Sequence, residues 1–127
     1  MAGTTAKAHA VRQVLTAYSS GAVSAATLTE YVMTFKGKII GVAADAETAG
    51  AGVGDTVLDI TVNGTSIWSL EANRPTLAAA STGAFANAIP RATARNVKAG
   101  DIVILSVASI SDTGHARLSL SAAVEMA

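Results

Sequence analysis

The stretch that decides the fold runs from residue 52 to residue 70 and reads GVGDTVLDITVNGTSIWSL. Leu58, Ile60 and Val62 are apolar and alternate with polar residues, which is the period of two of a half-buried strand. Asn63-Gly64 comes next, and this pair supplies the positive φ angles that a two-residue hairpin turn needs. We therefore predict an antiparallel β protein built around a hairpin, with strands at about 55–62 and 65–70.

The direction of Trp68, the only tryptophan of the chain, depends on the type of this turn. In a two-residue turn Ile60 faces Ile67, and residues directly opposite share a face of the sheet. Trp68 then points outward, as an intermolecular contact would. A three-residue bulged turn shifts the register by one and turns Trp68 into the core. Both interpretations stay open, and we favour the outward one.

Length and composition indicate one domain with a core of aliphatic side chains. The chain has 127 residues, of which 50% are hydrophobic and only 4% aromatic, and this length suits a single domain. Much of the hydrophobic fraction is alanine, so Val, Ile and Leu must build the core, as in a thin β-sandwich. There is no cysteine, so stability must come from the core or from partners.

The charges argue against two classes of partner. Nine basic residues balance nine acidic ones, and a neutral chain has no electrostatic footprint for nucleic acid or an anionic membrane. No window of about 18 apolar residues is present, so we expect no membrane span. The N-terminus also lacks the charged-then-apolar order of a signal peptide.

The first part of the chain differs in pattern from the remainder, and we predict an N-terminal arm over residues 1–27 and a β domain over 28–127. Val11, Val14, Leu15 and Tyr18 recur at the spacing of a short amphipathic helix. The alternative is a flexible leader without a helix.

The rest of the chain has the pattern of a series of strands. We expect one long strand from about residue 29 to residue 44, with Gly37 and Gly41 marking a bend or bulge. Residues 102–107 are apolar on both faces, which is typical of a central or covered strand. About eight strands, with turns every 8–12 residues, predict an eight-stranded antiparallel sandwich or jelly roll. The other expected elements are a loop at 49–54, short strands at 76–80 and 84–89, turns at 98–101 and 111–114, and a last strand at 118–126.

Candidate catalytic residues are few. Only His9 and His115 are bases near neutral pH. His115 lies close to Asp112, but nothing in the sequence positions a nucleophile or an oxyanion hole beside them. We interpret His115 as a solvated turn histidine, and we expect neither enzymatic activity nor a cofactor.

Metal and nucleic-acid sites have little support. The carboxylates near loop ends form no dense ligand ladder for calcium, and two distant histidines without cysteine do not make a zinc site. Arg91, Arg95 and Lys98 form the only basic cluster and lack the interleaved aromatic residues that stack on bases. We interpret this cluster as a solvated loop or a rim that pairs with an acidic partner. The carboxylates considered are Asp45, Glu47, Asp55, Asp59 and Asp101.

Three segments taken together resemble the jelly-roll domains of tailed-phage virion proteins, among them head decoration (cement) proteins, head fibers and some tail-fiber domains. The segments are LDITVNGTSIW at 58–68, NRPTL at 73–77 and VKAGDIVI at 97–104. The resemblance covers residues 28 to 126. Each segment alone is a common β-protein motif, and the ordered set is more specific.

The resemblance implies a non-enzymatic, usually trimeric protein that reinforces the outside of a capsid. Its partners would be other copies of itself and the major capsid protein. It would be made in the host cytoplasm and end on the capsid surface of the virion, with the N-terminal arm supplying contacts. Two features depart from the pattern, because the loop at 111–114 is short and the leader is long. The contact residues that we predict are Val11, Val14, Leu15, Tyr18, Trp68, Arg91 and Arg95.

Two alternatives belong to other functional classes. A fiber or receptor-binding domain of the same family would contact a host glycan through its loops. A small enzyme on a cupin-like barrel would need a histidine-rich metal site, which His9 and His115 do not supply.

Overall fold

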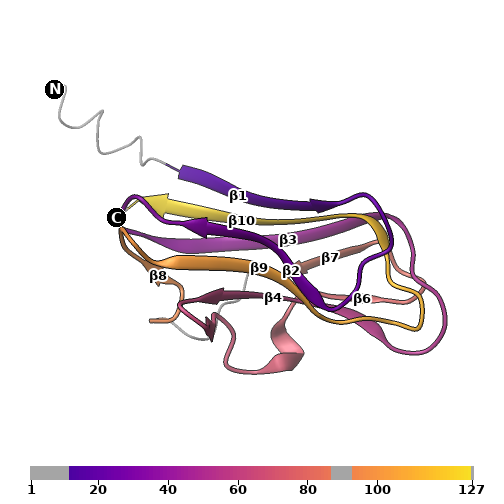
Figure 1. Ribbon diagram of the computed structural model, residues 1–127. Helices are drawn as coiled ribbons and strands as arrows, with labels where there is room; N and C mark the ends of the chain where they lie inside the picture. The colour runs from indigo at the N-terminus through magenta and orange to yellow at the C-terminus, as the bar shows by residue number, and fades with distance from the viewer. Residues whose placement is uncertain (1–11, 87–92, 127) are drawn as a thin grey trace, which may run out of the picture.

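The computed structural model describes residues 12–86 and 93–126, which fold into two antiparallel sheets packed face to face (Figure 1). Sheet A has the strand order β1-β10-β3-β7, with β8 also paired to β3. Its strands are β1 (Arg12–Ser19), β10 (Ala116–Met126), β3 (Gly37–Thr48), β7 (Gly83–Ala86) and β8 (Asn96–Val97). Sheet B has the order β2-β9-β4-β5, with β6 also paired to β4. Its strands are β2 (Ala26–Val32), β9 (Ile102–Ser109), β4 (Asp55–Val62), β5 (Thr65–Ser66) and β6 (Thr76–Ala78).

The connectivity is that of a jelly-roll-like sandwich. The first and last strands, β1 and β10, are neighbours in sheet A, and β2 and β9 are neighbours in sheet B. The chain therefore wraps around itself as a folded ribbon, which is how a jelly roll nests its Greek keys. The predicted all-β sandwich is confirmed. In addition to its eight principal strands it has two short strands, β5 and β8, which span two residues each.

The core lies between the two sheets and is aliphatic, as the composition predicts. Alternate residues of the long strands point into it, because successive side chains of a strand face opposite sides. In β10, for example, Leu118, Leu120, Ala122 and Val124 are fully buried. The core also holds Leu15, Ala17, Ile39, Val42, Leu58, Ile60, Ile67, Trp68, Leu77, Val103, Leu105 and Val107.

The predicted N-terminal helix is wrong, because residues Arg12–Ser19 form strand β1. This strand pairs antiparallel with β10 from Arg12↔Glu125 to Ser19↔Leu118. Leu15 and Ala17 point into the core, so the residues alternate with a period of two. Within the predicted arm, residues 12–19 are therefore an edge strand of the sandwich, residues 26–27 begin β2, and residues 1–11 lie outside the described residues.

The single long strand expected at residues 29–44 is also wrong. The chain forms two strands there, β2 in sheet B and β3 in sheet A, and changes sheets between Val32 and Gly37. Main-chain hydrogen bonds between Met33 and the corner at Gly100 and Asp101 hold this crossover. A bulge does occur near Gly41, where the β3–β10 register shifts opposite Ala123 and Val124.

The predicted hairpin between β4 and β5 is confirmed. Asn63 and Gly64 have φ angles of 51° and 88°, as a two-residue turn requires, and Val62 pairs with Thr65. The outward direction of Trp68 is nevertheless wrong, because its side chain is 2% exposed. The pairing of β5 ends at Ser66, so the strand alternation does not continue to Trp68, and the chain turns it into the core.

A side-chain contact joins this turn to the corner before β9. Asn63 Nδ2 donates to Asp101 Oδ1 over 3.0 Å, and the Ile102 amide donates to Asn63 Oδ1 over 2.9 Å. The other carboxylate oxygen of Asp101 accepts from the Lys98 amide at 3.0 Å. Asp101 is buried, so these hydrogen bonds replace the water that its carboxylate loses on folding.

The segment after β5 is held by a second carboxylate. Asp59 accepts hydrogen bonds from the amide of the next residue, Ile60, and from the Ser66 hydroxyl, at 2.8 and 2.7 Å. Arg74 lies 3.5 Å from the other carboxylate oxygen. Arg74 comes directly after the short 3-10 helix η1 (Glu71–Asn73). The corner at 71–75 is therefore tied to the outer side of β4.

Candidate interaction surfaces

The outer face of sheet A is the side turned away from sheet B, and four strands contribute to it. Residues directly opposite on paired strands share a face. One row across the sheet contains Thr16, Ser121, Ala43 and Phe85, which pair in that order on β1, β10, β3 and β7. We call this row the central row. The rows on either side of it contain Tyr18, Ser119, Asp45 and Gly83, and Val14, Ala123 and Gly41.

The inner strands of this face, β10 and β3, carry mostly small side chains, and its outer strands, β1 and β7, carry large exposed apolar ones. Phe85 on β7 is 69% exposed, and Tyr18 and Val14 on β1 are 61% and 57% exposed. On β10 and β3, serine, alanine and glycine separate these two margins, together with the exposed Asp45 on β3. Such a flat, weakly polar surface with exposed aromatic residues is typical of interaction sites.

The structure distributes the predicted contact residues unevenly. Val14 and Tyr18 lie on the outer face of sheet A, whereas Leu15 and Trp68 are 1% and 2% exposed and belong to the core. The prediction of Leu15 and Trp68 as surface contacts is therefore wrong, because β1 is a strand and the ladder ends before Trp68. Arg95 is half-buried, and Val11 and Arg91 lie outside the described residues.

The outer face of sheet A as a unit was not predicted from the sequence. The helix prediction placed Val14 and Tyr18 on one side of a helix with Leu15, and nothing assigned a role to Phe85. A usable signal was present, since Val14, Thr16 and Tyr18 alternate with Leu15 and Ala17. That alternation was hidden because the inward residue Ala17 is small and the outward residues are large.

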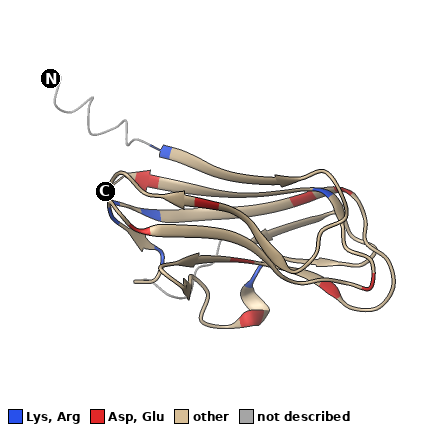
Figure 2. Cartoon of the chain, viewed as in Figure 1, with Lys and Arg blue, Asp and Glu red and all other residues tan. Residues whose placement is uncertain are grey.

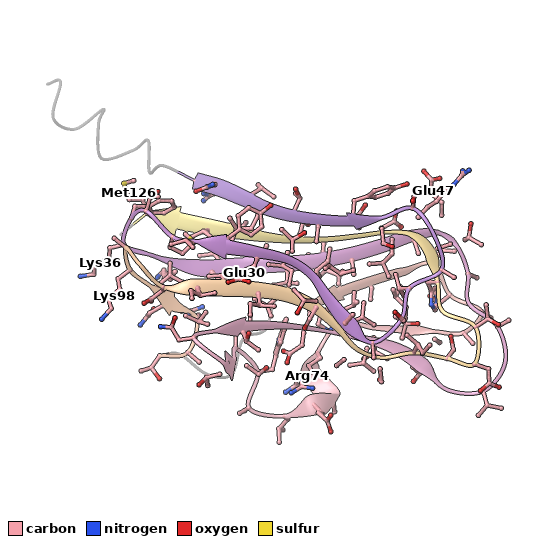
Figure 3. All side chains as sticks on the ribbon, in the orientation of Figure 1. Glu30, Lys36, Glu47, Arg74, Lys98 and Met126 are labelled. Atoms are coloured by element: carbon pink, nitrogen blue, oxygen red, sulfur yellow. The ribbon has the colours of Figure 1, made fainter. Side chains whose placement is uncertain are left out.

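Charge is separated along the sandwich although the chain as a whole is neutral. Figure 2 shows most of the basic residues of the described chain near the end where β1, β3 and β9 begin, and it shows acidic residues at both ends. Figure 3 shows Lys36 and Lys98 at the first end, which we call the basic end, and Glu47 at the other, the acidic end. The basic end also has Arg12 and Lys38, with the carboxylates Asp101 and Glu125 among them, and the acidic end has Asp45, Asp55 and Asp112, with Arg117 among them.

Two of the ion pairs lie on the outer face of sheet A, one near each end. Arg12 lies 3.1 Å from Glu125 at the basic end, and Arg117 lies 3.3 Å from Glu47 at the acidic end. These pairs are largely exposed, so each contributes little to stability. Lys38 lies beside Glu125 in the β3–β10 register.

His115 is not the solvated turn histidine that the sequence suggested, because it is fully buried. Its Nε2 lies 2.8 and 3.1 Å from the carbonyl oxygens of Ser81 and Ala78, and its Nδ1 lies 2.8 Å from the Thr56 hydroxyl. Carbonyl oxygens only accept, so Nε2 carries a proton, and in the neutral ring Nδ1 accepts from the hydroxyl. Both nitrogens therefore have partners that link β4, β6 and the turn before β7.

This arrangement gives His115 no contact with a carboxylate of the described residues. Asp112 instead accepts a hydrogen bond from the Val53 amide at 2.9 Å. The Ser111 hydroxyl donates to the Thr113 carbonyl at 2.7 Å. Ser111, His115 and Asp112 thus each hydrogen-bond to other groups that hold the loops together, and among the described residues they form no Ser-His-Asp triad.

The basic end of the sandwich also contains a hollow of about 500 Å³, which is lined by Lys36, Asn63, Thr93, Asn96 and Lys98, among others.

Within residues 12–86 and 93–126, no three histidine, aspartate or glutamate side chains converge as metal ligands would. In the same described ranges, no helix has the length and apolar character that crossing a membrane requires.

Comparisons with known proteins add no relative. The chain matches no protein-family model, no curated protein and no solved structure. The class that the fold itself defines is an all-β, jelly-roll-like sandwich.

Proposed function

We propose that this chain is a structural virion protein of a tailed phage, which decorates and stabilises the exterior of the capsid as an oligomer. The observation that carries the proposal is the contact between segments on which the family resemblance rests. Asn63, in the first segment, bonds to Asp101 in the third. Arg74, in the second, pairs with Asp59 in the first.

These contacts support the proposal because they turn separate motifs into one structural unit. The hairpin turn, the corner at Arg74 and the turn before β9 are common features when taken singly. Here the carboxylates of Asp59 and Asp101 are both buried and bind partners from the other segments. The ordered set of segments thus corresponds to a set of mutual contacts.

The fold supports a scaffolding role in a further way. Its two sheets form a rigid body whose loops and outer faces are available to partners, while the core is closed. The partners that we propose are other copies of the chain, for which the resemblance favours a trimer, and the major capsid protein. The place of action is the capsid surface, after synthesis in the host cytoplasm.

The proposed attachment arm is shorter than the sequence pattern suggests. Residues Arg12–Ser19 are strand β1, and Leu15 and Ala17 from this strand fill the core. Removing residues 1–27 would therefore expose β10 and damage the sandwich. We confine the proposed arm to residues 1–11.

Binding to capsids tests the proposal. The full chain and a chain lacking residues 1–11 are mixed with capsids of the phage that encodes it, and bound protein is measured by co-sedimentation. A chain in which residues 1–11 are shuffled is the matched control for length and composition. We expect the full chain to bind and both altered chains to bind at least tenfold more weakly, since multivalent attachment amplifies each arm contact. Undiminished binding would remove the arm from the mechanism, and absence of binding by the full chain would contradict the proposal.

A further inference from the structure

We propose that the outer face of sheet A is a self-association surface, on which two copies of the chain stack antiparallel about a two-fold axis lying along the central row. This inference goes beyond the proposed function and does not depend on it. It rests on the arrangement of side chains on this face and on the charges at its two ends.

The middle of the face is suited to contact with another protein surface. The central row and the row containing Val14 and Ala123 carry no charged residue. Serine, alanine and glycine make up most of the remaining positions of the three rows, Asp45 is their one charged residue, and Tyr18, Val14 and Phe85 are the large exposed side chains. Small side chains leave room for aromatic residues of an opposing sheet, and stacked sheets lie about 10 Å apart.

The charged residues near the ends of this face have opposite signs at similar distances from the central row. On β10, Glu125 lies four residues beyond Ser121 in one direction and Arg117 four residues in the other. On β3, Lys38 is level with Glu125, and Glu47 lies within 3.3 Å of Arg117. Each of these two strands therefore carries a positive and a negative side chain on opposite sides of the row.

A two-fold axis along the central row uses this symmetry. It places each strand over its own counterpart in the second copy, running in the opposite direction. Lys38 then faces Glu47 of the second copy, and Glu125 faces Arg117 of the second copy. Tyr18 meets Val14 of the second copy, because these two residues flank Thr16 on β1. The surface is thus complementary to itself, as an isologous interface requires.

The other simple stacking is disfavoured. An axis parallel to the strands, between β10 and β3, would set Lys38 opposite Glu125 and Glu47 opposite Arg117 of the second copy. It would, however, also bring together the two basic ends, which hold Lys36 and Lys98 as well, and likewise the two acidic ends. Like charges across an interface oppose association, whereas the antiparallel arrangement sets the basic end of each copy on the acidic end of the other. The net charge of the two ends therefore favours the antiparallel pair over the parallel one.

The size of the face sets the strength of the pairing. Four strands at about 4.8 Å spacing and about nine residues at about 3.4 Å rise give a patch of roughly 600 Å² per copy. The total of about 1,200 Å² only just exceeds the roughly 1,000 Å² expected of a specific interface. We therefore expect a weak pair, with a dissociation constant in the micromolar range.

Sedimentation velocity of the full chain over a range of concentrations tests the proposal. We expect a mass of two chains, or of six if the chain also forms trimers elsewhere on its surface. A mass of one or three chains at every concentration up to about 1 mM, well above the micromolar range expected of so small an interface, would overturn the proposal.

Charge exchange tests the axis itself. Lys38→Glu and Glu47→Lys each turn two symmetry-related attractive contacts into repulsive ones, and both residues are exposed. We expect each change alone to raise the dissociation constant about tenfold and the double variant K38E/E47K to restore it. Single variants that pair as well as the original chain, or a double variant that does not recover, would overturn this geometry.

A substitution on the axis gives a second readout. Ser121→Arg places two like charges opposite each other at the centre of the pair and should abolish it. Ser106→Arg is the matched control, because Ser106 is equally half-buried and points outward from the central strand of sheet B. Circular dichroism confirms that both variants are folded before their masses are compared. Equal loss of pairing in both variants, or in neither, would contradict the assignment to sheet A.

Discussion

Asn63 and Asp101 lie 38 residues apart and form a hydrogen bond of 3.0 Å between the hairpin turn and the corner that begins β9. The side-chain oxygen of Asn63 also accepts a hydrogen bond from the Ile102 backbone amide, and the backbone amide of Asn63 donates to the Ile102 carbonyl. The turn and the corner are therefore one structural element at the basic end of the sandwich. Asp101 is the residue on which this element depends, because its second oxygen binds the Lys98 amide.

Replacing Asp101 with alanine should destabilise the protein markedly. The change leaves the Asn63 side chain and the Lys98 amide without their acceptor, and hydrogen bonds to a charged group contribute about 1.5–3 kcal/mol each. We expect a loss of about 2–3 kcal/mol in the free energy of unfolding, measured by urea titration. Asp55→Ala, at the exposed other end of β4, is the control and should change little. Equal effects of the two substitutions would show that the contact contributes nothing specific.

The hydroxyl of the buried Thr56 should contribute to the stability of the folded chain. Thr56→Val keeps the shape of the side chain and removes the group that lies 2.8 Å from His115 Nδ1. Leaving a buried polar atom without a partner costs about 1–3 kcal/mol, so the melting temperature should fall by several degrees. Thr27→Val, on an exposed position of β2, provides the comparison. A melting temperature for Thr56→Val that matches the Thr27 variant would mean that the His115 contacts are dispensable.

The fluorescence of Trp68 offers a direct test of the core. Because it is the only tryptophan and is 2% exposed, the folded chain should emit at short wavelength and resist quenching by iodide. Urea should shift the emission and make the indole accessible. Trp68→Ala removes a large core side chain and should cost about 3–5 kcal/mol. Strong quenching in the folded protein at a concentration where it is monomeric would contradict the burial of this side chain.

The Tyr31 hydroxyl should stabilise the edge strand β1 by hydrogen bonding to its backbone. Its hydroxyl donates to the Thr16 carbonyl at 2.6 Å and accepts from the Thr16 amide at 3.1 Å, so it connects β2 of one sheet to β1 of the other. Tyr31→Phe should lower stability by about 1–2 kcal/mol and speed hydrogen exchange at the Thr16 amide. Tyr18→Phe, on a side chain that is 61% exposed, should do neither. Unchanged exchange at Thr16 in Tyr31→Phe would contradict the bridging role.

Strong local signals were sufficient to predict much of this fold. The alternation in β4 and β10 and the run of apolar residues in β9 identified long half-buried or central strands, and Asn63-Gly64 identified the turn between β4 and β5. These features are encoded within a few residues, by side-chain period and by backbone conformation. The sandwich class could be predicted from the number and spacing of the strands.

The errors arose where distant parts of the chain decide the outcome. Strand β1 exists because β10, at the other end of the chain, pairs with it, and a local spacing of apolar residues suggested a helix instead. The crossover between β2 and β3 ends at Gly37, which the sequence indicated only as a bend or bulge within one strand, and the crossover contains no proline. The surface on sheet A could not be predicted for the same reason, since it combines four strands that only the topology brings together.

Labelling of intact particles tests the central claim most directly. Virions of the phage that encodes the chain are purified, and antibodies against the folded protein are located on them by immunogold electron microscopy. A decoration role predicts gold over the capsid surface of every particle, in many copies. Gold confined to the tail would contradict decoration and favour the receptor-binding alternative, and particles without gold would contradict a virion role altogether.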